Sequence, residues 1–345
     1  MSKLLVVNYC MDLDNPSLSH QVEAVNSLAQ YFETVTVVTG KIGRFEPASN
    51  VKVISSNWNP GRPISNLINF YRRALPELAQ ADVVFSHMAE VQALFLAPFA
   101  KIIRTPHFLW YAHAYPSKYL SSAYFLLDGI VTSTSGSCPI KKRNVFTIGQ
   151  AINPKDFYRV DTPTRNLDMY CHVGRFDSSK GIEEIIRATG LQRVKNPNIK
   201  LTLIGSPSNE KQMNYSLSVK KKYKNNDWIL FSNSISREWI PDFLSHQDIF
   251  VHAYKGSLDK TLIEATLFGL PVVTLNLEYL RVFGTWLPGD INNVSLEAEL
   301  KFLNEMDIAS RVNEVRRRQS LALSGHTLHS WAKKLSELLN GAIKF

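Results

Sequence analysis

The sequence has few cysteines and no long apolar run. Its 345 residues contain three cysteines, Cys10, Cys138 and Cys171, which are widely spaced and form no CxxC pair. They are too few for a disulfide scaffold and too scattered for a zinc site, so a reducing compartment is the expected environment. The longest apolar run, Val91 to Ala100, has ten residues, whereas a helix needs about 18 to cross a bilayer.

The pattern of the first residues also does not predict a secretory leader. The apolar stretch from Lys3 to Cys10 meets Asp12 and Asp14 too soon for a signal peptide and is typical of a first buried strand. We therefore expect a soluble, cytoplasmic protein that contacts a membrane only peripherally.

Low-complexity segments and short-period repeats are absent, and the composition is that of a globular protein. Apolar residues make up 45% and charged residues 20% of the chain, which excludes disorder, collagen and coiled coil as the main architecture. Lys and Arg number 39 against 30 Asp and Glu, a net charge of +9. This excess favours polyanionic partners, namely phosphates, nucleic acid or an anionic membrane, without choosing among them.

Short apolar segments alternate with helical patterns along the chain. Strands alternating with helices of 10–15 residues indicate βαβ units and a parallel sheet. In the first half the expected strands are 4–9, 34–39, 51–55, 83–87, 108–113, 129–133 and 145–149, with helices at 19–32 and 64–78. In the second half the expected strands are 169–173, 200–204, 228–232, 249–253 and 271–275, with helices at 182–194, 209–224, 237–245 and 260–268.

The pattern restarts after a polar segment with two prolines, 152–168, which is the best candidate for a linker. The stretch from Leu296 to Phe345 is helical throughout, with a break at Gly325. We predict two doubly wound, Rossmann-like α/β domains, residues 1–151 and 152–325, followed by a helical segment, 326–345. In such folds ligands bind at the carboxyl ends of the strands, and a cleft between the domains is the default pocket.

A loop with two cations follows the strand 169–173. Arg175 and Lys180 lie between that strand and the next helix, flanked by Gly174 and Gly181. Cations beside a helix N-terminus suit a phosphate or diphosphate, although solvated loop charges are the alternative. Gly205, after the strand 200–204, would allow a ligand to approach closely, or it simply forms an ordinary turn.

The stretch from Ala253 to Thr274 carries the most specific pattern. Asp259 is a good N-cap for a helix from Lys260 that ends at Gly269. The opening turn of that helix favours an anion, although Asp259 competes for the same N–H groups. Glu264 lies one turn into the helix among apolar neighbours, and pairing with Lys260 is its alternative role.

In these motifs the second half resembles the retaining, nucleotide-sugar-dependent glycosyltransferases of family 4, often called group 1. The shared order is Gly-Arg…Lys-Gly (174–181), Leu-Ile-Gly (203–205) and Glu-Ala…Gly-Leu-Pro-Val-Val (264–273). The resemblance covers roughly 169–277 well and the remainder by pattern only. It implies the GT-B architecture, in which two Rossmann-like domains face each other across a cleft. The second domain then holds the sugar donor, the first holds the acceptor, and the final helix, 330–339 with Trp331, crosses back to the first.

The resemblance also implies roles for individual residues. Arg175 and Lys180 match the cations that neutralise the donor diphosphate and the departing nucleotide, and Glu264 matches the glutamate that binds the ribose. The first glutamate of the motif is replaced by Gly256 here, which leaves sugar recognition open, and Asp259 is the nearest substitute. The loop that usually binds phosphate and sugar corresponds to Ser257, Leu258, Asp259, Lys260 and Thr261.

In the first domain, His113 follows a strand at a position where the family often places a histidine near the reacting carbon; a structural histidine is the alternative. The glycine-rich loop common in relatives is absent at 17–20, and His20 is a weak candidate. Asp12 and Asp14 spell DxD, but their place after the first strand favours a polar loop over a metal site or an acceptor contact. We expect transfer without a metal or other cofactor.

Three basic clusters remain, Lys141–Arg143, Lys220–Lys222 and Arg316–Arg318. They are not interleaved with aromatic residues, so nucleic acid is not an expected partner. Solvated faces are the simplest interpretation, and contact with an anionic membrane is the alternative.

These observations predict a retaining, hexosyltransferase-type glycosyltransferase that moves a sugar from UDP or GDP to a glycan or lipid-linked acceptor, in bacterial surface polysaccharide synthesis. An epimerase of nucleotide sugars with the same build, and a non-catalytic scaffold subunit, are the alternatives. The sugar, the acceptor and the oligomeric state stay open.

Overall fold

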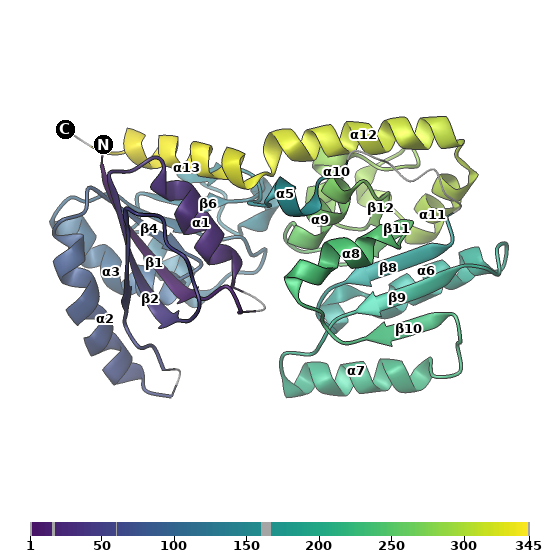
Figure 1. The fold of residues 1–345 in the computed structure, drawn as a ribbon, viewed down its shortest axis with the longest axis horizontal. Helices are drawn as coiled ribbons and strands as arrows, with labels where there is room; N and C mark the ends of the chain where they lie inside the picture. Colours follow the sequence, from purple (N-terminus) through teal and green to yellow (C-terminus); the bar gives the residue numbers. More distant parts are fainter. Residues whose placement is uncertain (1, 16–17, 60, 160–166, 344–345) are drawn as a thin grey trace. The chain divides into compact units, whose positions relative to one another are not determined.

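The computed structural model describes residues 2–15, 18–59, 61–159 and 167–343 (Figure 1). The chain divides into two compact units, Met1–Ala151 with Thr327–Phe345, and Ile152–His326. Each unit contains one sheet whose strands all pair in parallel, seven strands in the first and five in the second. The predicted pair of doubly wound α/β domains is confirmed.

The first sheet has the order β3-β2-β1-β4-β5-β6-β7. Its strands are β1 (Lys3–Met11), β2 (Thr34–Ile42), β3 (Val51–Ser55), β4 (Val83–His87), β5 (His107–Trp110), β6 (Gly129–Thr132) and β7 (Val145–Thr147). The central strand β1 is almost wholly buried, because helices cover both faces of the sheet.

Two apolar layers enclose this sheet. One layer holds α1 (His20–Ala29) and α13 (Leu328–Gly341), whose Trp331 is fully buried. The other layer holds α2 (Pro63–Leu78), α3 (Glu90–Ile102) and α4 (Lys118–Tyr124). The start of β1 lies beside α13, since the Ser2 hydroxyl donates to Asn340 on that helix (Figure 1). A short 3-10 turn, η1 (Ser135–Ser137), follows β6.

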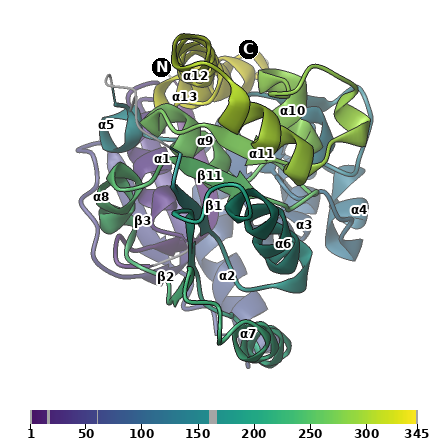
Figure 2. The ribbon, with the colours of Figure 1, turned by 90° about the vertical axis from the view of Figure 1, so that its right-hand side faces the viewer.

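The second sheet has the order β10-β9-β8-β11-β12. Its strands are β8 (Met169–Val173), β9 (Lys200–Ile204), β10 (Ile229–Ser232), β11 (Ile249–His252) and β12 (Val272–Thr274). One face packs against α6 (Ile182–Arg193), α7 (Glu210–Lys222) and α11 (Leu296–Glu305), with α6 and α11 side by side in Figure 2. The other face packs against α5 (Pro154–Phe157), α8 (Ile240–Ser245), α9 (Lys260–Phe268), α10 (Leu277–Phe283) and α12 (Ile308–Gly325). Three 3-10 turns, η2 (Ser178–Lys180), η3 (Arg237–Trp239) and η4 (Ile291–Asn293), complete the unit.

Several sequence expectations need correction. The proposed linker 152–168 is wrong at its start, because α5 lies there and buries Phe157 in the second core; residues 160–166 lie outside the described residues. The C-terminal helical stretch breaks at Met306 and Asp307 as well as after Gly325. Helices α3, α4 and α10 were not predicted. Seven residues are too few to establish a helical period in α4 and α10, and α3 is apolar on most of its faces, so its period is weak.

None of the helices in the described residues is long and apolar enough to cross a membrane. The three cysteines are all buried and unpaired with one another.

Candidate functional site

The candidate site lies at the carboxyl edge of the second sheet, where the strand order reverses between β8 and β11. The chain leaves β8 toward β9 on one side, and β11 pairs with β8 on the other. Crevices at such reversal points are where doubly wound sheets bind ligands. The loops that follow β8 and β11 carry most of the residues singled out from the sequence.

Lys180 is the buried cation of this site. It ends the turn η2, and its residue is only 6% exposed. Its ammonium forms an ion pair with Asp259 and stands 3.9 Å from the centroid of the Tyr254 ring. Burying a charge costs desolvation free energy. The carboxylate and the tyrosine ring face both attract the ammonium and offset that cost. The Lys180 side chain therefore joins the loop after β8 to the loop after β11.

Gly181 explains why Lys180 can approach β11 so closely. It has a φ of +63° and forms the N-cap of α6. A Cβ at this position would lie 2.6 Å from the Cβ of Ala253. Both the left-handed backbone and the contact favour glycine.

Asp259 does not act as the helix cap that the sequence predicts. It occupies the N-cap position of α9, but its side chain makes no capping hydrogen bond. The carboxylate turns instead to Lys180 and to Nε2 of His252, 3.0 Å away. We expected Asp259 to compete with an anion for the backbone N–H groups in the first turn of α9. It does not compete, because its side chain does not bond to those groups.

The protonation of this cluster follows from its hydrogen bonds. Burial lowers the pKa of His252, so its imidazole is neutral. Because a carboxylate only accepts, Nε2–H donates to Asp259, and Nδ1 accepts from the Thr274 hydroxyl at 3.0 Å. Burial alone would raise the pKa of Asp259, but the His252 hydrogen bond and the Lys180 charge outweigh it and hold that pKa well below its usual value. The site therefore holds an ionised Asp259 at neutral pH.

Tyr254 gives a physical reason for glycine at position 256. A Cβ on Gly256 would lie 2.1 Å from the Tyr254 hydroxyl. The phenol thus fills the space in which a side chain at residue 256 would begin. The role of Asp259, three residues on, as a substitute for the missing first glutamate of the motif stays a prediction.

Asn276 holds the shape of this loop and was missed in the sequence. Its side-chain amide donates to the carbonyls of Tyr254, Gly256 and Ser257, each at 3.1 Å. Its Oδ1 also caps α10 by accepting from the Tyr279 N–H at 3.0 Å. An asparagine between a strand and a helix is a capping signal that the sequence does contain, whereas its contacts to the loop arise only from the fold.

Glu264 is buried in α9 and faces a cation from a distant segment. Its Oε1 lies 2.8 Å from a guanidinium nitrogen of Arg237, in η3. Arg237 also stands over the Phe157 ring at 5.2 Å. No sequence pattern links residues 237 and 264, so Arg237 is a second residue that sequence reasoning missed.

Arg175 and Gly205 flank the site. Arg175 is exposed, and no salt bridge joins it to the residues that the structure describes. Its charge helps to lower the pKa of Asp177, although the Ser179 hydroxyl contributes most. A Cβ on Gly205 would lie 1.8 Å from the carbonyl oxygen of Gly174. The chain's own backbone therefore requires glycine here, and a donor contact at Gly205 stays a prediction.

The loop residues between Gly256 and α9 are partly hidden. Ser257 and Leu258 are buried, while Lys260 and Thr261, the first residues of α9, are half-buried. Their contact with a ligand stays a prediction.

In the first unit the predicted residues lie on separate segments. His113 is exposed after β5, with its ring 5.4 Å from that of Tyr111. His20 opens α1 and contacts the His87 ring at 5.8 Å. The Asp12 carboxylate accepts from the backbone N–H groups of Asp14 and Arg44, which is the behaviour of a polar loop.

The basic clusters differ from one another. Arg318 is 2% exposed, donates to Glu314 at 2.8 Å and lies 4.1 Å from the Trp286 ring. The expectation that all of Arg316–Arg318 form a solvated or membrane-facing surface is therefore wrong. A long arginine stem on an internal helix face can reach buried carbonyls, which charge alone does not indicate.

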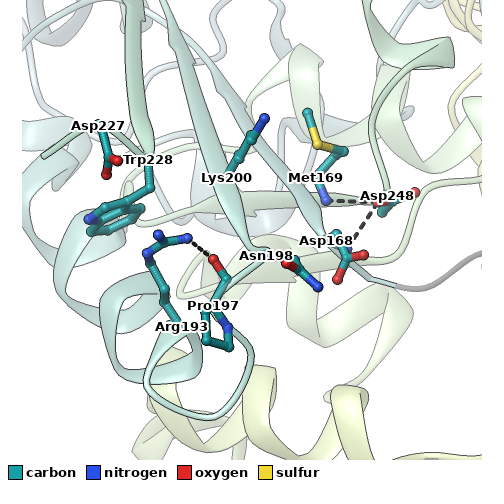
Figure 3. Close-up of a pocket in the computed structure, with 9 residues that line it drawn as sticks. All are labelled: Asp168, Met169, Arg193, Pro197, Asn198, Lys200, Asp227, Trp228 and Asp248. Carbon is teal, nitrogen blue, oxygen red and sulfur yellow. Dashed lines mark hydrogen bonds between the residues drawn. The ribbon is translucent and has the colours of Figure 1, made fainter.

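A pocket of about 750 Å³ lies at the opposite, amino edge of the second sheet (Figure 3). It is lined by Met169, Lys200 and Trp228, at or just before the starts of β8, β9 and β10, and by Asp248, which accepts from the Met169 N–H at 2.7 Å. Because this edge is remote from the carboxyl ends of the strands, the pocket is not part of the candidate site.

Among the described residues, no group of three or more His, Cys, Asp or Glu side chains is arranged to hold a metal ion. Whether the protein works without a metal stays a prediction.

Comparisons with known proteins agree with this architecture. Residues 155–282 match the family model "Glycosyl transferases group 1". No curated protein matches the chain. HepE of Anabaena, solved with UDP-glucose, has a TM-score of 0.74 at 14% identity, over 99% of this chain and 100% of that one.

Two further solved structures share the fold. Sucrose-phosphate synthase from Thermosynechococcus elongatus has a TM-score of 0.74 at 15% identity, over 99% of each chain. WaaG, a glycosyltransferase involved in lipopolysaccharide biosynthesis, has a TM-score of 0.65 at 15% identity, over 98% of this chain and 100% of WaaG. Residues 155–282 therefore match a model of group 1 glycosyltransferases, and the whole chain shares the two-domain GT-B fold of these solved structures.

Proposed function

We propose that this protein is a retaining glycosyltransferase that moves a sugar from a nucleoside diphosphate to a glycan or lipid-linked acceptor. UDP is favoured over GDP as the nucleoside diphosphate. The observation that carries the proposal is the buried Lys180, which the loop after β8 delivers to the opening turn of α9. The complex of HepE with UDP-glucose supports a UDP-sugar as donor. The role of WaaG in lipopolysaccharide biosynthesis supports a bacterial surface glycan as the product.

The diphosphate is assigned to Lys180, Arg175 and the first turn of α9. An ammonium has three donors, so Lys180 can hold Asp259 and a phosphate oxygen together. Arg175 is exposed and forms no salt bridge with the described residues, so it can move onto the same phosphates. The N-terminus of α9, which Asp259 does not cap, adds backbone donors.

In the reaction the bond between the anomeric carbon and the phosphate oxygen breaks, and the acceptor hydroxyl oxygen forms the new bond to that carbon. The acceptor proton passes to the departing phosphate on the same face of the sugar, which retains the configuration. Lys180 and Arg175 stabilise the charge that develops on the leaving group. No metal takes part in this scheme.

Glu264 is assigned to the ribose, and Tyr254 with Asp259 to the sugar hydroxyls. A carboxylate accepts from hydroxyls, and a phenol both donates and accepts. Buried Glu264 is held by Arg237, which keeps its second oxygen in a fixed direction. His113 is assigned to the acceptor side of the reaction.

The test compares UDP binding by calorimetry in the wild type and in Arg175→Ala. Loss of a charge-assisted hydrogen bond weakens binding about 10- to 100-fold. Arg316→Ala removes an exposed arginine of the same unit and serves as the matched control. Equal affinity in all three proteins would remove Arg175 from the site.

Product analysis then tests the reaction itself. Incubation with UDP-sugars and glycan acceptors should give an extended glycan whose new linkage keeps the donor's anomeric configuration by NMR. An isomerised UDP-sugar without transfer would favour an epimerase, and the absence of any nucleotide-sugar binding would favour a scaffold subunit.

A further inference from the structure

Glu264 lies where the buried helix α9 meets the edge of the second core. Its side chain is 6% exposed, and its neighbours on the helix, Leu262, Ile263 and Ala265, are buried in that core. Several dihedral angles separate the carboxylate from the backbone, so burial alone does not fix the direction in which its two oxygens point. A partner outside α9 is needed to set that direction.

Arg237 is that partner, and it comes from a distant segment of the chain. It opens η3, which follows β10, and one of its guanidinium nitrogens lies 2.8 Å from Oε1 of Glu264. The next helix, α8, packs with α9 in the same apolar core (Figure 1), which brings η3 to Glu264. The Arg237 side chain is 32% exposed, so the ion pair lies at the rim of the core, where a ligand can reach it.

The ring of Phe157 supports the guanidinium of Arg237 in turn. Phe157 lies on α5, is 1% exposed and belongs to the same apolar core. The guanidinium carbon of Arg237 stands 5.2 Å from the centroid of this ring. A guanidinium on an aromatic face can still donate to a carboxylate in its own plane, which an ammonium cannot do. Phe157, Arg237 and Glu264 thus form a chain of contacts across three elements.

Stability alone gives no reason for this chain of contacts. The carboxylate of Glu264 and the guanidinium of Arg237 both lose water on burial, and apolar side chains of similar volume are often as stable in such a place. What the ion pair provides is a fixed geometry. When the guanidinium holds one carboxylate oxygen, the second oxygen keeps one direction and can accept from hydroxyl groups without being ordered first.

We propose that Arg237 is a positioning residue through which the donor site selects ribonucleotides. Arg237, supported by Phe157, holds Glu264 so that its second oxygen accepts from the ribose hydroxyls. A nucleotide without those hydroxyls leaves this oxygen without a donor, so the site rejects it. The inference rests on the ribose contact of the proposed function, and it adds which residues fix that contact and what the contact selects.

Calorimetry with two probes, UDP and 2′,3′-dideoxy-UDP, tests the proposal. Both probes carry the same uracil and diphosphate, so damage to the fold or to the phosphate site weakens both equally and leaves the ratio of the two dissociation constants unchanged. The wild type should prefer UDP about 10- to 100-fold, because hydrogen bonds to a carboxylate are lost with the hydroxyls. Glu264→Gln and Arg237→Met should each lower this preference to less than about fivefold. Arg237→Lys keeps the charge but not the planar group, so its preference should be intermediate.

Arg281→Met is the matched control. Arg281 also pairs with a buried glutamate of the second unit, Glu278, whose side chain is 5% exposed, but both residues lie on α10. Its loss therefore leaves a buried carboxylate without its arginine, as Arg237→Met does, at a place to which we assign no ligand. This variant should keep the wild-type preference for UDP over the dideoxy probe.

The variant Arg237→Met/Glu264→Gln shows whether Arg237 acts through Glu264. If both changes remove the same contact, the double variant should bind UDP within about twofold of Glu264→Gln alone. A preference that survives Arg237→Met, or losses of UDP affinity that simply add, would overturn the inference and leave the proposed donor site standing. A wild type that binds UDP and the dideoxy probe equally would overturn it too. A wild type that binds neither probe would refute the proposed donor site itself, and this inference with it.

Discussion

Replacing Asp259 with asparagine tests how the loops after β8 and β11 are held together. The substitution keeps the shape of the side chain but removes the charge that faces Lys180. Lys180 has an 8% exposed side chain, and that of Asp259 is 28% exposed. Removing one partner of a buried pair costs about 3–5 kcal/mol, and the partial exposure of Asp259 lowers the expected loss to about 2–4 kcal/mol.

Thermal unfolding followed by calorimetry measures this loss. For a unit of this size each kcal/mol corresponds to roughly 2–4 °C, so the transition of the second unit should fall by about 5–15 °C. Asp307→Asn is the matched control, because Asp307 is an exposed cap of α12 that accepts from the Ser310 N–H. Asparagine caps equally well, so that variant should change by less than about 0.5 kcal/mol.

A double-mutant cycle shows whether the loss comes from the pair. Lys180→Gln should also destabilise the protein, but Asp259→Asn/Lys180→Gln should be more stable than the sum of the two losses predicts, by about 1–3 kcal/mol. Simple additivity of the two losses would refute the ion pair as the link between the loops, whatever the size of each loss.

Two further predictions concern the loop clamp and acid stability. Asn276→Ala leaves the carbonyls of Tyr254, Gly256 and Ser257 without their shared donor. We therefore expect the free energy of unfolding to fall by about 1–3 kcal/mol and the UDP-induced thermal shift to become smaller. Unchanged UDP affinity would show that the loop keeps its shape without the Asn276 hydrogen bonds. Burial lowers the pKa of His107 and of His172 to about 3. Below pH 6.5 the unfolded chain therefore binds protons that the native state does not, and stability should fall by about 1.4 kcal/mol per histidine between roughly pH 7.5 and 5.5. In denaturant unfolding at several pH values, His172→Gln should remove the part of this pH dependence that His172 contributes, while His252, whose pKa burial also lowers, keeps its own part; an unchanged pH slope in that variant would contradict the assignment.

The elements themselves could be predicted from local pattern. Helix α9 begins at Lys260 and ends at Phe268 as expected, because Gly269, with a φ of +88°, is the residue type that a helix end of this kind favours. The central strands could be predicted for a different reason. A strand buried on both faces begins with a run of apolar residues in place of an alternating pattern, as in Val83–Phe85 of β4 and Ile249–Val251 of β11.

The partners of the polar side chains could not be predicted in the same way. The sequence favoured Asp259 as a cap and offered Lys260 as an alternative partner of Glu264, since both are local interactions. The structure instead pairs Asp259 with Lys180 and Glu264 with Arg237. Each of these contacts joins segments that only the strand order brings together.

By itself, then, the sequence determined two parallel α/β units and placed a cationic loop and a helix N-terminus at the ends of strands, because periodicity and capping act within a few residues. Only the tertiary structure decided that Tyr254 occupies the space above Gly256, that Asn276 ties down the loop, and that Arg318 is buried. Those outcomes depend on which strands are neighbours and on how closely their loops pack, and neither is encoded in any short stretch of the chain.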